Sequence, residues 1–205
     1  MSQGTTIWLA RHAEAHNPRA VLYGRLPRVN LSVAGRRQAE ALAQALATRP
    51  IAAVYSSPML RARQTAALVA HQHPSAGPAH VDVDLHEIRS GWQGEPLSAI
   101  DGIAWDFYAH PRGAADESLA AIRDRMQRWV GRVLKRHAGG EVVGVSHGDP
   151  VLVLVAALKG LLLEIGSIRP QSYPPPGAVY RLLFDGAGQC RDIELVATPA
   201  DGRHP

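Results

Sequence analysis

The sequence predicts an α/β fold, a three-layer α/β/α sandwich with a mostly parallel central sheet and a small irregular cap. Three observations predict it. Short apolar runs that are typical of buried strands alternate with longer segments of helical periodicity, which favours parallel strands with helices on both faces. Residues 91–115 follow neither pattern and carry several aromatic side chains, as a cap would. The length of 205 residues suits one domain, and we expect residues 1–205 to form it.

Six segments are expected to be strands. Four short apolar runs are each followed by polar residues. Two further runs near the end of the chain, separated by Gly186 and Gly188, are expected to form a closing hairpin. The expected strands are residues 7–10, 51–55, 81–85, 141–145, 178–184 and 191–197.

Four segments are expected to be helices. Ser32 is expected to cap the first, and Ser57 precedes Pro58 as an N-cap residue precedes a proline at the first helical position. Asp116 is expected to cap the third helix, which the glycine pair 139–140 ends. The expected helices are residues 32–47, 57–69, 116–137 and 149–163.

The composition argues against several classes of protein. Hydrophobic residues make up 46% and charged residues 20% of the chain, as in an ordinary globular protein. No apolar run approaches the length of a transmembrane helix, and residues 1–6 lack the basic start of a signal peptide. Cys190 is the only cysteine and cannot form an internal disulfide, which favours a reducing cytoplasm.

The net charge is +4 and the isoelectric point about 9.6, values that can accompany nucleic acid binding. However, the 22 basic residues include only two lysines, and the arginines are scattered without a basic tract. We therefore expect neither a nucleic acid partner nor a membrane partner.

Chemically useful side chains follow each of the first four expected strands. Arg11 and His12 follow the first, and Arg61 lies in the first helical turn after the second. Glu87 follows the third strand and His147 the fourth. Each of these alone has an ordinary explanation, such as a solvated arginine, a core histidine or a carboxylate in a salt bridge. Because ligands bind beyond the carboxyl ends of parallel strands, the four placements together predict a site at one edge of the sheet.

The residue types in this set suit phosphoryl transfer. An arginine presents a planar fork of donors that matches phosphate oxygens. A neutral imidazole is a nucleophile that can form a covalent intermediate, and a second, protonated histidine adds positive charge. A carboxyl group can protonate a leaving alkoxide and then act as base for water.

Several motifs in order resemble those of the histidine phosphatase superfamily, the phosphoglycerate-mutase-like proteins, in its phosphatase branch. Residues 9–14 resemble its Arg-His-Gly motif, and residues 56–66 its Ser-Ser-Pro-Leu-x-Arg-Ala-x-Gln-Thr-Ala motif. Residues 85–94 resemble its Leu-x-Glu-Ile-x-x-Gly-x-Trp-Glu-Gly motif. Residues 116–118 stand where the family often has Gly-Glu-Ser, and residues 146–148 are its Ser-His-Gly.

The resemblance runs over residues 7–185 and implies a role for each matching residue. His12 would take the phosphoryl group, and Glu87 would be the acid and base. The residues that would bind phosphate are Arg11, Arg61, His147 and Asn17.

The sequence departs from the family at three places. Ala13 stands where the family usually has glycine, which requires that residue 13 does not adopt a positive φ. Asn17 lies one residue nearer to His12 than the usual asparagine, and the segment after Glu87 is one residue shorter than the common pattern. These departures bear on the roles of Asn17 and Glu87.

We expect no metal and no cofactor. His12 with His16, and His71 with His73, have the spacing of a zinc pair, but no third ligand stands at metal spacing. Arg11 beside His12 would also repel a cation.

The expected activity is hydrolysis of a small phosphorylated metabolite in two steps through a phosphohistidine, by a monomer or a homodimer. Two alternatives stay open, a phosphoglycerate mutase and a non-catalytic protein that binds phosphorylated ligands. Between Glu87 and Asp116 the only basic residues that we take as relevant are Arg89 and Arg112. A short cap with so few basic residues favours hydrolysis over return of the phosphoryl group to a second hydroxyl.

Overall fold

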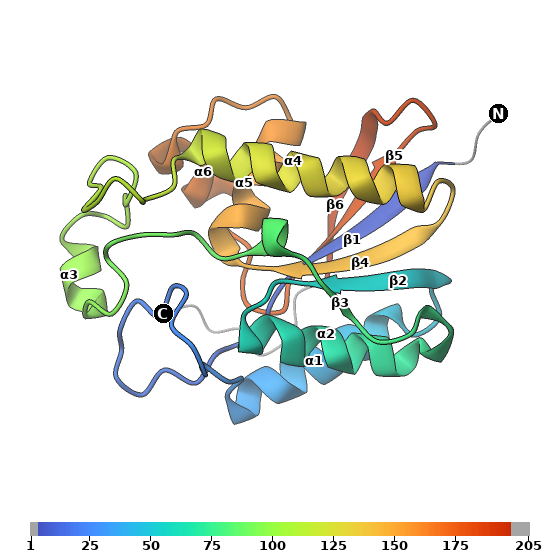
Figure 1. Cartoon of the computed structure of the whole chain (residues 1–205), viewed down its shortest axis with the longest axis horizontal. Helices are drawn as coiled ribbons and strands as arrows, with labels where there is room; N and C mark the ends of the chain where they lie inside the picture. The colour runs from blue at the N-terminus through green and yellow to red at the C-terminus, as the bar shows by residue number, and fades with distance from the viewer. Residues whose placement is uncertain (1–3, 198–205) are drawn as a thin grey trace.

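The computed structural model describes residues 4–197 and has a six-stranded sheet in the order β3-β2-β4-β1-β5-β6 (Figure 1). The first four strands pair in parallel, while β5 and β6 join as an antiparallel hairpin beside β1. The sheet is therefore mostly parallel, as predicted. The strands are β1 (Thr5–Arg11), β2 (Ile51–Ser56), β3 (His80–Val81), β4 (Glu141–Ser146), β5 (Val179–Phe184) and β6 (Cys190–Ala197).

Helices cover both faces of this sheet. In Figure 1, α1 and α2 lie on one face and α4, α5 and α6 on the other, which confirms the three-layer sandwich. The helices are α1 (Val33–Leu46), α2 (Leu60–Gln72), α3 (Leu97–Asp101), α4 (Leu119–Arg136), α5 (Gly148–Leu158) and α6 (Ile165–Ser172). None of the helices in residues 4–197 has the length and apolar character needed to cross a membrane.

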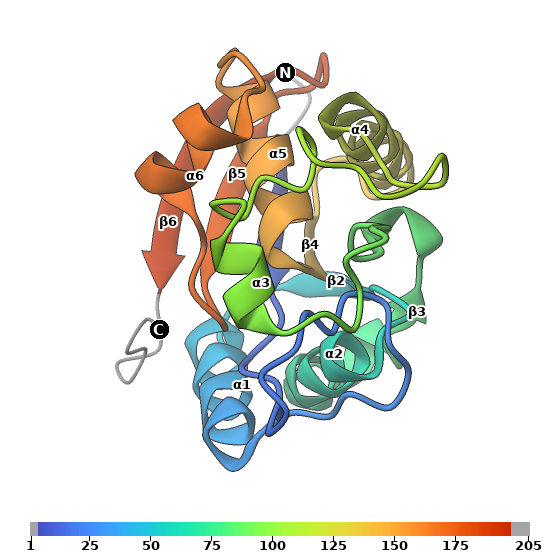
Figure 2. The ribbon, with the colours of Figure 1, turned by 90° about the vertical axis from the view of Figure 1, so that its left-hand side faces the viewer.

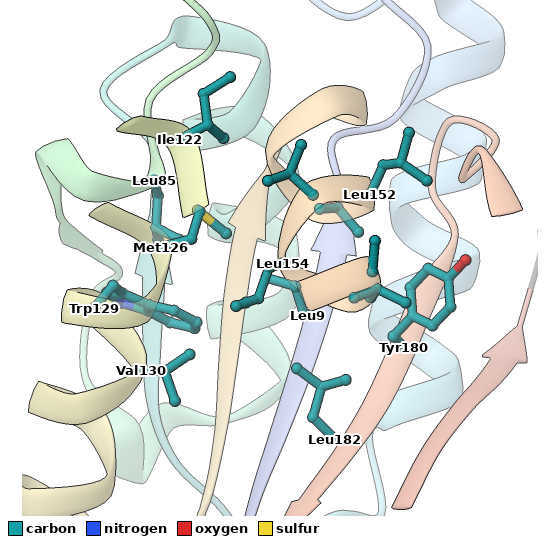
Figure 3. Close-up of a cluster of buried hydrophobic side chains, with 14 of the residues drawn as sticks. Leu9, Leu85, Ile122, Met126, Trp129, Val130, Leu152, Leu154, Tyr180 and Leu182 are labelled. Atoms are coloured by element: carbon teal, nitrogen blue, oxygen red, sulfur yellow. The ribbon is translucent and has the colours of Figure 1, made fainter. Parts of the chain in front are cut away.

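Strand β1 divides the core into two layers because its side chains alternate between the faces of the sheet. Ile7 and Leu9 belong to the larger apolar cluster with α4 and α5, and Trp8 and Ala10 to the cluster with α1 and α2. Figure 3 shows the larger cluster between β1, β5, α4 and α5. Both apolar clusters pack on the same sheet, which supports our proposal that the chain forms a single domain. Residues 1–3 and 198–205 of the proposed domain lie outside the described residues.

The predicted third strand, residues 81–85, is wrong in most of its length. Only His80–Val81 pairs with β2, and Val83–Leu85 forms a 3₁₀ turn. The Asp82 carboxylate accepts a hydrogen bond from the Asp84 amide at 2.9 Å, which caps that turn and ends the strand.

Three predicted helix boundaries also differ. Helix α2 begins at Leu60, because the Ser57 hydroxyl accepts from the Met59 amide in a turn before the helix. Ser118 and not Asp116 caps α4. Helix α5 ends at Leu158, followed by Gly160 at φ +70°, and the remaining residues of that segment lead into a separate helix, α6, that the sequence did not predict.

The cap segment, residues 91–115, contains the short helix α3. Figures 1 and 2 place α3 and the chain around it beyond one end of the sheet, the end from which α5 leaves β4. The Trp92 indole donates to the His110 carbonyl at 2.7 Å, which closes the segment on itself.

Candidate active site

The parallel strands bring the predicted site residues to one edge of the sheet. His12 follows β1, Arg61 lies in the first turn of α2 after β2, and His147 follows β4. All three side chains are buried, with at most 1% of their surface exposed. Glu87, just after the 3₁₀ turn, lies beside them with 14% of its side chain exposed.

The hydrogen bonds of His12 fix its tautomer. Its Nδ1 lies 2.7 Å from the Ala13 carbonyl oxygen, which can only accept, so Nδ1 carries the proton. Its Nε2 accepts from Arg61 Nε at 3.0 Å and therefore holds a lone pair. Burial, and after it the charges of Arg61 and Arg11, hold the pKa of His12 well below its usual 6.5. His12 is thus a neutral imidazole whose unprotonated Nε2 has the lone pair that a nucleophile needs, here bound by Arg61.

Arg61 is the centre of the cluster. One terminal nitrogen donates to the Gly24 carbonyl at 2.9 Å and lies 3.1 Å from His147 Nδ1 and 3.4 Å from Glu87 Oε2. The other terminal nitrogen is buried without a hydrogen-bond partner in the described structure. An unpaired buried donor costs roughly 1–3 kcal/mol, more for a charged group, so this atom is prepared to receive an anion.

Arg11 brings a second guanidinium to the same edge. It donates to the Pro174 carbonyl at 2.8 Å and packs over the Tyr173 ring at 5.1 Å. Its Nε is also buried without a partner in the part of the chain that the structure describes. Two arginines with unused buried donors form a site that suits a dianion such as a phosphoryl group.

His147 is oriented from both ring nitrogens. Nδ1 faces the donating Arg61, so the proton lies on Nε2, which donates to the Ser57 hydroxyl at 2.7 Å. Burial, followed by the charge of Arg61, lowers the pKa of His147 well below 6.5. The second histidine is therefore neutral in the unliganded site, whereas the sequence argument considered it protonated.

Burial makes the Glu87 carboxyl a weaker acid than an exposed glutamate. Burial raises its pKa above the ordinary value of 4.5, although Arg61 and the hydrogen bond from the Ile88 amide act in the opposite direction. Oε1 accepts from that amide at 2.9 Å, and Oε2 lies 3.4 Å from both Arg61 and His147. The shorter segment after Glu87 thus does not prevent this carboxyl from reaching the cluster.

Asn17 is not joined to the cluster by the hydrogen bonds that the structure gives it. Its side-chain amide donates to the Val21 carbonyl at 2.9 Å and accepts from the Val21 amide at 3.3 Å, which closes a local turn. Glu14 is also held elsewhere, by the Ser32 hydroxyl at the start of α1. Ala13 is buried and is not among the residues with positive φ, so its methyl group is accommodated.

The sequence argument missed two contributors to the site. The Tyr23 ring lies 4.5 Å from the Arg61 guanidinium carbon and meets the His12 ring edge-on at 6.4 Å between centroids. The Ser57 hydroxyl, expected to cap a helix, instead orients His147. Neither role has a sequence signal of its own, because each depends on contacts between distant parts of the chain.

Three site residues also meet the distance criterion for a metal centre. One ligand atom each from His12, Glu87 and His147 lies within 4.8 Å of the others. However, the Arg61 guanidinium is within 3.4 Å of ligand atoms of all three. A cation there would face a buried positive charge, so the residues present do not suit a metal.

Taken together, the structure is an α/β fold in which two buried histidines, two arginines and a carboxylate meet at one edge of a mostly parallel sheet. The chain belongs to the histidine phosphatase superfamily (branch 1), which it matches over residues 7–193. The resemblance inferred from the motifs is thereby confirmed.

Relatives and solved structures agree with this membership. The chain is 39% identical over 166 residues to the uncharacterised Mycobacterium tuberculosis protein Rv0525, covering 78% of this chain and 81% of that protein. It is 32% identical over 166 residues to phosphoserine phosphatase 1 of Hydrogenobacter thermophilus, covering 76% and 77%. Bacillus stearothermophilus YhfR superposes with a TM-score of 0.79 at 28% identity, over 91% of this chain and 94% of that one. Membership of this family and the similarity to a named phosphatase support phosphatase activity for this chain.

Proposed function

We propose that this protein is a metal-independent phosphomonoesterase that hydrolyses small phosphorylated metabolites through a phosphohistidine at His12. The observation that carries the proposal is the pairing of a neutral imidazole with unused arginine donors. His12 Nε2 holds a lone pair, and buried nitrogens of Arg11 and Arg61 have no partner. These are the groups that an attack on a phosphate dianion needs.

In the first step, His12 Nε2 attacks the phosphorus in line with the ester oxygen. The new N–P bond forms as the P–O bond breaks, and the protonated Glu87 carboxyl gives its proton to the leaving alkoxide. Arg11, Arg61 and His147 bind the phosphoryl oxygens while charge moves toward the leaving group. The histidine proton stays on Nδ1, bound to the Ala13 carbonyl.

In the second step, the Glu87 carboxylate takes a proton from water. The water oxygen bonds to phosphorus, the N–P bond breaks, and neutral His12 and inorganic phosphate result. Glu87 ends protonated and ready for another cycle. The raised pKa of Glu87, caused by burial, supports this alternation because it favours the protonated form relative to an exposed carboxyl group.

The proposal also covers a further pocket residue, the substrate class and the location of the enzyme. Asn17 is retained as a phosphate-pocket residue only if its turn with Val21 opens on binding. The named relative acts on phosphoserine, which supports a small phosphorylated substrate. We place the enzyme in the cytoplasm on the ground of its single cysteine, and we retain a monomer or a homodimer as its expected state.

Alkaline quenching of a reaction with ³²P-labelled p-nitrophenyl phosphate tests the intermediate, because phosphohistidine survives base and is lost in acid. We expect labelled protein from the wild type and none from His12→Ala. Turnover should persist after EDTA treatment and exhaustive dialysis. A loss that Mg²⁺ or Zn²⁺ restores would refute metal independence.

The same preparation decides between hydrolysis and phosphotransfer. With 3-phosphoglycerate, with and without 2,3-bisphosphoglycerate, a phosphatase releases free phosphate and forms no 2-phosphoglycerate. Isomer forming much faster than phosphate would identify a mutase. Binding of phosphorylated ligands without turnover would identify a non-catalytic member.

A further inference from the structure

The carboxylate of Glu117, just before α4, accepts hydrogen bonds from three donors, two arginine side chains and one backbone amide. Its Oε2 accepts from Arg25 at 2.8 Å and from the backbone amide of Arg89 at 2.8 Å. Its Oε1 accepts from Arg125 Nε at 2.9 Å. Only 18% of the side chain is exposed. A carboxylate with three charge-assisted or backbone donors is well ordered.

The partners of Glu117 enclose the segment that carries Glu87. Arg25 Nε donates to the Glu87 carbonyl oxygen at 2.7 Å, and Arg125 donates to the Asp84 carbonyl oxygen at 2.7 Å. The Glu117 amide also donates to the Arg89 carbonyl oxygen at 2.9 Å. Residues 84–89 are therefore fixed before, at and after Glu87, and every one of these contacts leads back to Glu117.

The charge of Glu117 is needed for this arrangement. Arg25 and Arg125 converge on one carboxylate, and Arg25 also lies near Arg89. Without the carboxylate, two guanidinium groups would lie together without a counter-charge, and separation of either would release the carbonyl of Glu87 or of Asp84. The position of the Glu87 backbone thus depends on an anion that never contacts the Glu87 carboxyl.

We propose that Glu117 is a positioning residue that, through Arg25 and Arg125, holds Glu87 in reach of the leaving-group oxygen. This inference rests on the proposed role of Glu87 as the acid. The two halves of the site are held differently. Apart from the bond of Arg61 to the Gly24 carbonyl oxygen, the phosphate-binding residues are held by β1, β4 and α2. Glu87 is held by Arg25 and, through Asp84, by Arg125, both of which bind Glu117 just before α4. Disturbing Glu117 should therefore impair proton donation and leave nucleophilic attack intact.

The test is single-turnover phosphorylation of Glu117→Gln by two substrates. A p-nitrophenolate leaves without a proton, whereas an alkoxide needs one. A displacement of about 1 Å in a reacting group costs about 10²-fold, so we expect a loss of that order with an alkyl phosphate. With p-nitrophenyl phosphate the rate should stay within about threefold, well short of that cost. In a Glu87→Gln background, the second substitution should change either rate by less than about twofold.

Glu141→Gln is the matched control. Glu141 is 16% exposed, accepts from Arg49 and from the Trp8 indole, and lies at the first residue of β4, remote from the site. The Glu141→Gln variant should lose about as much thermal stability as Glu117→Gln and should keep its activity with both substrates. Arg25→Lys supplies a second variant if Glu117→Gln folds poorly, because a lysine cannot bind Glu117 and the Glu87 carbonyl in one fork. It should show the same dependence on the leaving group.

The outcomes are distinguishable. Equal slowing of both substrates by Glu117→Gln, or a further loss in the Glu87→Gln background, would overturn the positioning role. If Glu87→Gln itself does not discriminate between the substrates, the acid role fails first. If wild-type protein forms no phosphohistidine, the proposed function fails, independently of Glu117.

Discussion

In the proposed reaction His12 and Glu87 act on different atoms of the substrate, so substitutions of the two residues should affect different substrates. We expect His12→Ala to abolish turnover of every phosphate ester, because no covalent intermediate can form. Glu87→Gln should slow phosphorylation by an alkyl phosphate roughly 10²–10⁴-fold and by p-nitrophenyl phosphate far less. Single-turnover rates with the two substrates measure this.

Two neighbouring residues supply controls for these substitutions. Glu14 is exposed and held by Ser32, and His16 is exposed in the loop that follows His12. Glu14→Gln and His16→Ala should leave both rates within about twofold, the ordinary range for substitutions outside the chemistry. If Glu14→Gln showed the selective loss and Glu87→Gln did not, the acid would be Glu14.

At the residue scale, the side chains predicted from strand ends are those that the sheet brings together. Arg11, His12 and His147 need only the rule that parallel strands end at one edge. Tyr23, which packs over Arg61, lies in a loop whose path no periodicity predicts. Contacts that depend on the path of a loop across the site therefore could not be predicted from the sequence.

Helix α1 is tied to the nucleophile loop through Gly35. A Cβ at residue 35 would lie 2.0 Å from the Glu14 carbonyl oxygen, a contact that only backbone movement can relieve. We expect Gly35→Ala to lower the free energy of unfolding by about 1–3 kcal/mol and to reduce activity, since the displaced backbone is two residues from His12. Urea unfolding and turnover of p-nitrophenyl phosphate measure the two effects.

Gly131, exposed in the middle of α4, is the matched control. A Cβ there meets nothing within 4 Å, and its φ is not positive. Gly131→Ala should raise the free energy of unfolding by about 0.5–1 kcal/mol and leave activity unchanged. Equal stability of the two variants would show that α1 does not constrain the nucleophile loop.

At the element scale, the sequence predicted most strands and helices but not the places where side chains override local propensity. Asp116 and Ser118 are both good caps by type. The Asp116 carboxylate instead accepts from the Gly91 and Arg112 amides at 2.8 and 2.9 Å, which leaves Ser118 to cap α4. The choice depends on where the cap segment folds back, and no local pattern contains that information.

At the scale of the whole molecule, the site requires two neutral histidines to be buried among arginines. His12 and His147 are both fully buried, and desolvation followed by Arg61 lowers the pKa of each well below 6.5. In the unfolded chain both would titrate near 6.5. Between these values the unfolded state binds more protons than the folded one, so acidification favours unfolding.

The free energy of unfolding should therefore be undiminished above about pH 6.5 and fall below it. Each histidine contributes a slope of up to about 1.4 kcal/mol per pH unit, about 2.7 for the pair. Glu87 acts in the opposite direction, because its raised pKa makes the folded state bind a proton first, but only as pH falls toward that pKa. His73, His86 and His137 also have lowered pKa values and add to the slope between pH 7.5 and 5.5, so the contribution of His147 is obtained from its variant and not from the wild-type profile alone.

Urea unfolding at intervals across this window measures the slope. His147→Asn should lower the slope by up to about 1.4 kcal/mol per pH unit whatever its effect on the absolute stability, because the slope counts protons and not contacts. A flat profile in the wild type would mean that His12 and His147 are already protonated in the folded protein, and the neutral nucleophile on which the proposed reaction depends would be lost with it.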